Sequence, residues 1–276
     1  GLFPERPNLV SLAQATWGAH VQYGRLFTST FELAPMYRDA LLHPIGVDKH
    51  DNRSPDNRLA EHILTFYWWG LITLDDADNL VALLFDSGTA VQKQHAIQYV
   101  GWSLGRTDEA IPSDVLDRLQ KLWDWRFPSL ARGAKSADAA TKEAAVEELE
   151  QFGHWFASKK LNLDWALSRF DAVVEITGGT ERGHSALEFL AEVAKEMPLA
   201  AATTLEKFSL TAGKDPWRFH LWKESAMAIM QAALNSTESG APEKAKLIIN
   251  KWIANVSPEY RQLLERRPPG TGHGQL

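Results

Sequence analysis

Apolar side chains recur along this chain at the spacing of one helix face, and the pattern is clearest in Glu150–Asp171. There Phe152, Trp155 and Phe156 fall at i, i+3 and i+4, so they share a face. A corner at residues 161–162 then interrupts the pattern before a second apolar stripe begins. Two amphipathic helices on a tight connection form an αα-hairpin. We therefore predict a helical hairpin in this segment.

Similar stripes follow one another along the rest of the chain, separated by short turns. No segment alternates with period two for long enough to form a strand, so we predict an all-α protein of about twelve helices. Pro128 is expected to end or kink the helix that opens at residues 111–113, because proline disrupts a helix interior. Other helices are expected over Asn8–Thr30, Pro35–Leu42, Asp56–Leu71, His184–Glu196 and Leu199–Thr211, and near Pro216, Pro242 and Pro258.

The predicted hairpins need neighbours, since a single hairpin cannot bury its apolar face alone. No repeat period is evident, which favours antiparallel hairpins stacked as an irregular α-solenoid of the HEAT/ARM-like kind. We predict one helical-repeat domain over residues 1–265, with a subdivision considered at the small-residue segment 133–140. Residues 266–276 have little apolar content and are predicted to form a disordered tail.

Composition narrows the function classes. The chain has 276 residues and a formal net charge of −6, so bulk attraction to a phosphate backbone is not expected and nucleic acid is a disfavoured partner. It contains no Cys, which excludes thiolate metal sites and fits a reducing compartment, and we expect a cytoplasmic protein. The most apolar run, Ile63–Leu74, is shorter than the roughly 20 residues of a membrane-spanning helix. The chain begins at Gly1 rather than Met, which suggests a fragment of a longer protein.

Tryptophan is abundant, with eleven residues, and the segment Trp123-Asp124-Trp125-Arg126 is the main candidate for a binding surface. Residues at i and i+2 do not share a helix face, so one Trp is expected in the core and the other at the surface. An exposed Trp beside Arg is typical of interface hot spots or of platforms that stack bases. Packing between neighbouring hairpins is the plainer interpretation of these rings.

His154 lies beside Trp155 on the aromatic face, and we interpret it as a hydrogen-bonded core histidine rather than a catalytic base. The candidate recognition surface taken together comprises Trp123, Trp125, Arg126, His154 and Trp155.

One segment nearly matches a phosphate-binding loop. Gly178–Ser185 has the G-x4-G spacing, but His184 replaces the lysine and the preceding residues have helical rather than strand spacing. We therefore interpret it as a helix–helix turn with the glycines as a C-cap. The cluster Asp75, Asp76 and Asp78 lacks the EF-hand pattern and is interpreted as a helix cap. No catalytic residue, metal site or cofactor is predicted.

Five segments carry a resemblance to known proteins: Ile111–Arg126, Phe152–Lys159, Trp165–Leu167, Trp217–Ala233 and Ala245–Leu264. Together they resemble the helical C-terminal region of large bacterial multidomain proteins, in which a SIR2-like or STAND/NACHT NTPase module precedes a long α-solenoid. Such proteins are often implicated in anti-phage defence. The resemblance rests on aromatic and turn positions rather than catalytic ones, and His154 stands where a further aromatic is expected.

The main hypothesis is a non-catalytic helical scaffold that senses or holds a protein partner, or that packs against an upstream domain of its own chain. A second hypothesis is a HEAT-like nucleic-acid binder or an all-α enzyme that uses Trp123, Asp124, Trp125, Arg126 and His154 in a concave groove. A plain oligomerisation module is the third.

Overall fold

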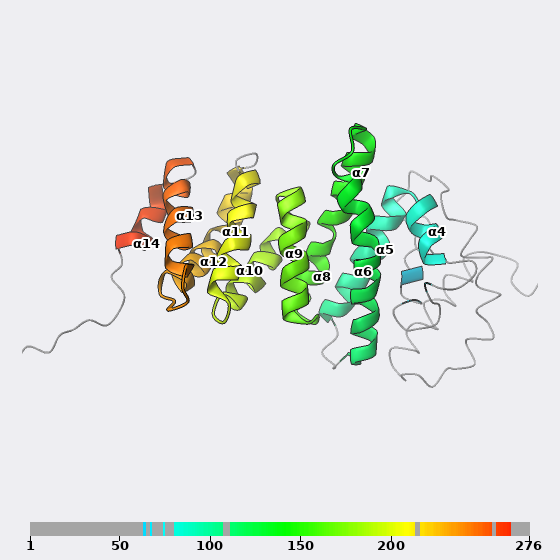
Figure 1. Cartoon of the computed structure of the whole chain (residues 1–276), viewed down its shortest axis with the longest axis horizontal. Helices are drawn as coiled ribbons and strands as arrows, with labels where there is room; N and C mark the ends of the chain where they lie inside the picture. Colours follow the sequence, from blue (N-terminus) through cyan, green and yellow to red (C-terminus); the bar gives the residue numbers. More distant parts are fainter. Residues whose placement is uncertain are drawn as a thin grey trace, which may run out of the picture. The chain divides into compact units, whose positions relative to one another are not determined.

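The structure is a computed structural model that describes residues 63, 64, 67, 74, 80–106, 111–212, 216–255 and 258–265. All regular structure in these residues is helical, which confirms the predicted all-α class (Figure 1). The helices expected over 8–30 and 35–42 and the tail at 266–276 lie outside the described residues. The chain divides into two compact units, Gly1–Gln151 (unit 1) and Phe152–Leu276 (unit 2). The expectation of one domain over 1–265 stays a prediction.

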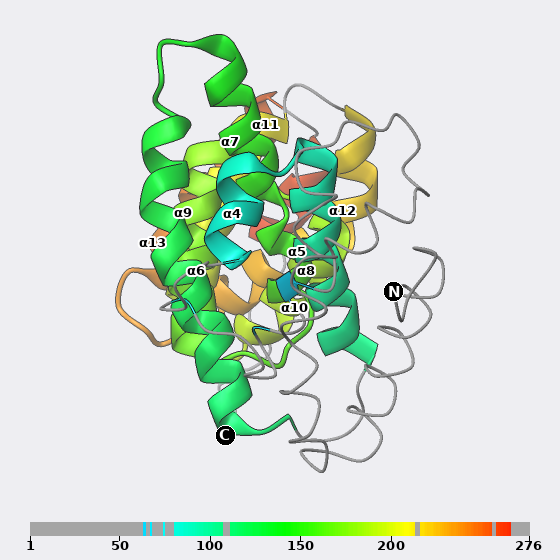
Figure 2. The same cartoon turned by 90° about the vertical axis from the view of Figure 1, so that its right-hand side faces the viewer.

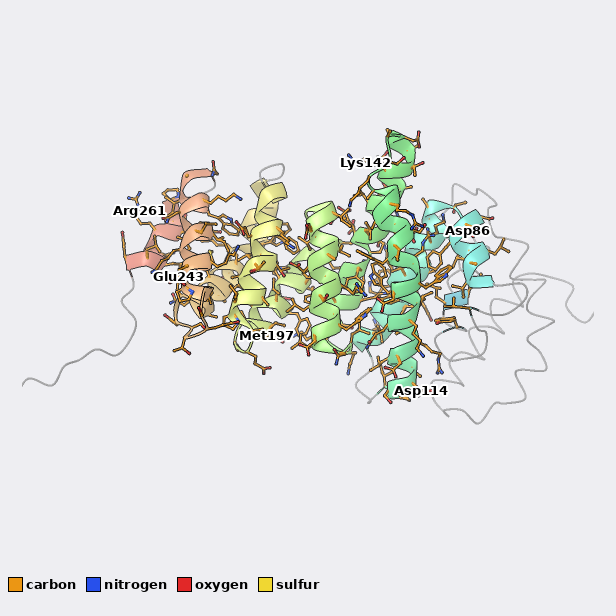
Figure 3. The ribbon with its side chains drawn as sticks, in the orientation of Figure 1. Asp86, Asp114, Lys142, Met197, Glu243 and Arg261 are labelled. Carbon is orange, nitrogen blue, oxygen red and sulfur yellow. The ribbon has the colours of Figure 1, made fainter. Side chains whose placement is uncertain are left out.

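Unit 1 contains α4 (Leu80–Ser87), α5 (Ala90–Arg106), α6 (Ser113–Gly133) and α7 (Ala139–Glu150). Helices α6 and α7 pack side by side and are joined by a short turn (Figure 2). Asp114 in the first turn of α6 and Lys142 in the first turn of α7 lie at opposite ends of this pair, so the two helices run antiparallel (Figure 3). Helix α5 packs against both α4 and α7. The segment 133–140 is thus the turn of a hairpin within unit 1.

Pro128 does not end its helix, contrary to one of the two outcomes expected for it. It lies inside α6, which continues to Gly133. The residues after it are held by packing, because Leu130 is buried and Gly133 lies against Ala145 of α7. Tertiary packing against the second helix of the hairpin therefore offsets the local cost of the proline.

Unit 2 is a succession of helices in which each contacts near neighbours. One series of contacts runs from α9 to α11 to α13, and the other from α8 to α10 to α12 to α14 (Figure 1). Aromatic rings occupy the core, with Phe156 stacked on Phe170 at 3.9 Å between centroids and Phe208 in edge contact with Trp222. The helices are α8 (Phe152–Phe156), α9 (Leu163–Thr177), α10 (Gly183–Val193), α11 (Pro198–Ala212), α12 (Pro216–Leu234), α13 (Ala241–Asn255) and α14 (Arg261–Glu265), with a 3-10 turn at Pro258–Tyr260.

The predicted hairpin in Glu150–Asp171 is present as α8 and α9, but its first helix is shorter than expected. Helix α8 ends at Phe156 rather than near the corner expected at residues 161–162, so the lysines at 159 and 160 follow the helix. Lys159 adopts a left-handed φ of 62°, which reverses the chain. Asn162 then caps α9, because its side-chain oxygen accepts a hydrogen bond from the Trp165 N–H at 3.0 Å.

Gly153 allows α8 to approach the turn between α9 and α10. A Cβ placed on Gly153 would lie 2.0 Å from the carbonyl oxygen of Glu181 and 2.7 Å from Oγ1 of Thr180. We expect Gly153→Ala to lower the free energy of unfolding by about 2 kcal/mol, because the neighbouring backbone must shift to admit the methyl group. Urea denaturation measures this loss. Gly179→Ala is the matched control, since nothing lies within 4 Å of its Cβ position, and equal losses in the two variants would contradict the close approach.

Candidate functional site

A cavity of about 450 Å³ opens in unit 1 among the helices α4, α5, α6 and α7. Its volume lies in the range typical of small-molecule and side-chain pockets, about 300–1,000 Å³. We call it the α4–α7 cleft. Its polar and charged lining includes Asp86, Lys93, Gln94, Arg126, Thr141 and Glu148.

The local sequence of α5 fixes the position of Lys93 in the cleft. Thr89 and Gln92 form a capping box, in which the Gln92 N–H donates to Oγ1 of Thr89 at 3.2 Å and the Thr89 N–H donates to Oε1 of Gln92 at 3.1 Å. Gln92 is fully buried, so this cap is held in the core. Lys93 follows directly in the first turn, and its backbone N–H donates to the carbonyl of Thr89.

A buried ion pair between α6 and α7 forms one wall of the cleft. Nε of Arg126 donates to Oε1 of Glu148 at 2.7 Å, and Nη2 donates to Oε2 at 3.0 Å. The two side chains are only 13% and 6% exposed. The guanidinium also lies 4.8 Å from the ring centroid of Phe85 on α4. This bidentate geometry gives the pair both strength and a fixed orientation, and it links three helices of unit 1.

Lys93 is the second cation of the cleft. Its Nζ makes no hydrogen bond and no ion pair with any residue that the structure describes. Burial lowers the pKa of Lys93 from its ordinary value, and the neighbouring Arg126 charge lowers it further, while Glu148 and Asp86 act in the opposite direction. The cleft therefore contains a partly buried cation whose charge is only partly compensated.

The two tryptophans of the Trp123–Arg126 segment lie in different environments, as predicted. Trp123 is 2% exposed and belongs to the core of unit 1, whereas Trp125 is 41% exposed. The ring of Trp125 lies 6.1 Å from that of Phe85, the residue that also contacts Arg126. The exposed indole of Trp125 therefore lies beside Arg126, which forms part of the cleft wall.

The other two candidate residues lie in unit 2. His154 is 7% exposed and Trp155 is 1% exposed. Trp123, His154 and Trp155 are therefore core side chains rather than surface ones, because each is packed among the apolar residues of its own unit. Only Trp125 and Arg126 come together at an accessible site. That the five residues bind a partner stays a prediction.

His154 is expected to make unit 2 sensitive to acid. Burial, together with the Arg182 charge, lowers the pKa of His154 from 6.5 to about 4. The unfolded chain thus binds a proton near pH 6.5 that the folded chain binds only near pH 4, so stability falls as pH drops through this window. The shift corresponds to roughly 3 kcal/mol. Urea denaturation at pH 7 and at pH 4.5 measures the loss.

His154→Gln should remove this component of the pH dependence. His184 offers the matched control, because it is exposed and pairs with Glu188 at 3.3 Å on the surface of α10. His184→Gln should leave the loss between pH 7 and pH 4.5 intact. If His154→Gln left the same acid loss as the parent chain, the neutral buried state of His154 would be wrong.

Of the charged and polar residues that line the cleft, only Arg126 was a candidate in the sequence. Lys93 and Glu148 are ordinary charged residues of amphipathic helices, and such residues usually face solvent. They meet only because α5, α6 and α7 pack together, so no local pattern marks them. The only local signal was the T-x-x-Q capping box at Thr89, which fixes where α5 begins.

The near match to a phosphate-binding loop is a helix–helix turn, as predicted. Gly178 has a φ of 74° and caps α9, with its N–H donating to the carbonyl of Val174 at 2.7 Å. Helix α10 begins at Gly183, five residues later. The cluster Asp75, Asp76 and Asp78 lies outside the described residues.

These observations define an all-α protein with a charged cleft in its first unit. Comparisons with family models, with curated proteins and with solved structures found no match to the chain. In the described part, none of the helices combines the length and apolar character that crossing a membrane requires. The same residues hold no group of three His, Asp or Glu side chains arranged to bind a metal ion.

Proposed function

We propose that this chain is a non-catalytic helical scaffold that binds a protein partner, or an upstream domain of its own polypeptide, through the surface around Trp125. The observation that carries the proposal is the exposed indole of Trp125 beside Arg126. Tryptophan and arginine are the residues most enriched among interface hot spots. The Phe85 ring, in contact with both residues, limits their motion before a partner arrives, which lowers the entropic cost of binding.

We further propose that the helices stack as an irregular α-solenoid. The support is the order of contacts in unit 2, where α9 meets α11 and α11 meets α13 while α10 meets α8 and α12. In solenoids each repeat contacts only its neighbours, and the resulting surfaces bind extended partners. The resemblance to the C-terminal regions of bacterial SIR2-like and STAND/NACHT NTPase-type proteins motivates the proposal that the chain is part of a larger defence protein.

The decisive experiment replaces Trp125 by the photo-crosslinking residue p-benzoylphenylalanine in the host cell. The same label at Asp117, an exposed position on the same helix, is the control. A protein adduct, identified by mass spectrometry, should form at position 125 and not at position 117. A crosslink between position 125 and another segment of the same polypeptide, if that polypeptide is far heavier than 30.9 kDa, would identify an upstream domain as the partner. Equal adducts at the two positions, or adducts to nucleic acid alone, would contradict the proposal.

A further inference from the structure

We propose that the α4–α7 cleft binds a carboxylate group of an acidic peptide segment, with Lys93 and Arg126 as the hydrogen-bond donors. The inference rests on the proposed function, because it names the chemistry of the segment that a protein partner presents beside Trp125. It is carried by three features of the cleft: an ammonium without a partner among the described residues, guanidinium donors without an acceptor among the same residues, and the charge of the lining.

The first feature is the contrast between Lys93 and another partly buried lysine. Lys207 on α11 is paired with Asp171 and Glu175 of α9, each at 2.7 Å, and these partners raise its pKa. Lys93 has a comparable setting between helices but no such partner in the part of the chain that the structure describes. A carboxylate of a bound peptide would pair with Lys93 as Asp171 pairs with Lys207.

The second feature is the set of donors on Arg126. A guanidinium carries five N–H groups. Nε and Nη2 serve Glu148 and the Phe85 carbonyl, while Nη1 has no acceptor among the described residues. Because Arg126 and Lys93 both line the cleft and repel each other, an anion that contacts both relieves the repulsion and satisfies donors on each.

The third feature selects a carboxylate over a phosphate. Two carboxylates, Glu148 and Asp86, also line the cleft, and Asp86 stands on α4 (Figure 3). The formal charge of the lining is therefore zero, with two cations and two anions. A dianionic phosphate would be repelled by both carboxylates at close range, whereas a single carboxylate can pair with the open donors of Lys93 and Arg126. An acidic side chain flanked by apolar residues would also place those residues near Trp125.

The test measures binding of a fluorescein-labelled hexaglutamate peptide to the full chain by fluorescence anisotropy at pH 6.5 and low salt. We expect Lys93→Gln to weaken binding at least tenfold and Lys93→Arg to retain it within about threefold. Lys121→Gln is the matched control, since Lys121 is an exposed lysine on α6 outside the cleft, and it should bind like the parent chain. Absence of binding, or equal binding by Lys93→Gln and the parent, would overturn the inference.

A second readout does not depend on how the variants fold. In the chain without substitutions, the pKa of Lys93, measured by NMR after isotopic methylation of the lysines, should rise when the peptide is added, because an anion favours the charged ammonium. An unchanged Lys93 pKa at saturating peptide would overturn the inference. Tighter binding of inorganic phosphate at Lys93, with displacement of the peptide, would also overturn it in favour of a phosphate site.

The two proposals fail in different ways. If the crosslink at position 125 persists undiminished in the Lys93→Gln variant, the scaffold function stands and the carboxylate inference is wrong. If hexaglutamate binds through Lys93 but position 125 gives no protein adduct, the cleft chemistry stands and the partner surface at Trp125 is wrong.

Discussion

Replacing Arg126 by methionine is expected to lower the free energy of unfolding by about 3–5 kcal/mol. The change removes the partner of Glu148, whose carboxylate is only 6% exposed and would be left as an uncompensated buried charge. Glu148→Leu should lower the free energy of unfolding by a similar amount, because it leaves the Arg126 guanidinium buried without its carboxylate partner. Urea denaturation followed by circular dichroism measures each loss.

The double variant Arg126→Met with Glu148→Leu separates two quantities. One is the net contribution of the ion pair to the free energy of unfolding, and the other is the loss caused by removing a single partner. Apolar residues of similar volume often replace a buried ion pair with little loss of stability. We therefore expect the double variant to be more stable than either single variant. If the loss of stability in the double variant equalled the sum of the two single losses, the two side chains would not act as a pair. That result would contradict the bidentate contact between them.

Trp155→Ala is expected to cost about 3–5 kcal/mol of folding free energy, because it leaves a cavity among the buried residues of unit 2. The indole is 1% exposed and contacts the Phe152 ring at 6.3 Å between centroids. The loss should show as a lower midpoint in urea denaturation.

Trp125→Ala is the control for this large effect, because the same truncation is made at a side chain that is 41% exposed. It should cost less than about 1 kcal/mol, mostly from the lost contact with Phe85. If Trp155→Ala were as mild as Trp125→Ala, the packing of α8 in the core would be wrong.

The helices of unit 2 could be predicted because their apolar stripes are local. Phe170, Val173 and Val174 share one face of α9 at helical spacing, and all three are buried. The cap at Asn162 depends only on a residue three positions later. Similarly, the different environments of Trp123 and Trp125 follow from helix geometry alone.

The cleft could not be predicted because it depends on contacts between distant segments. Lys93, Arg126 and Glu148 lie on three helices, and the sequence around each one describes an ordinary solvated face. The helix does not end at Pro128 for a related reason, since the packing of α6 against α7 offsets the local effect of the proline. The close approach of Gly153 to the Glu181 carbonyl, in the turn before α10, is likewise a contact between different helical segments.

The serial order of contacts in unit 2 has a consequence for how the unit opens. Within the described residues, the main contacts of helix α14 are with α12, α13 and the 3-10 turn that precedes it, whereas α11 and α12 each have neighbours on both sides. Native proteins open in cooperative segments, and segments with few contacts open at the lowest free energy. Amide hydrogens should therefore exchange with deuterium fastest in Arg261–Glu265 and slowest in α11 and α12. The unit would then lose its structure from its C-terminal end inward.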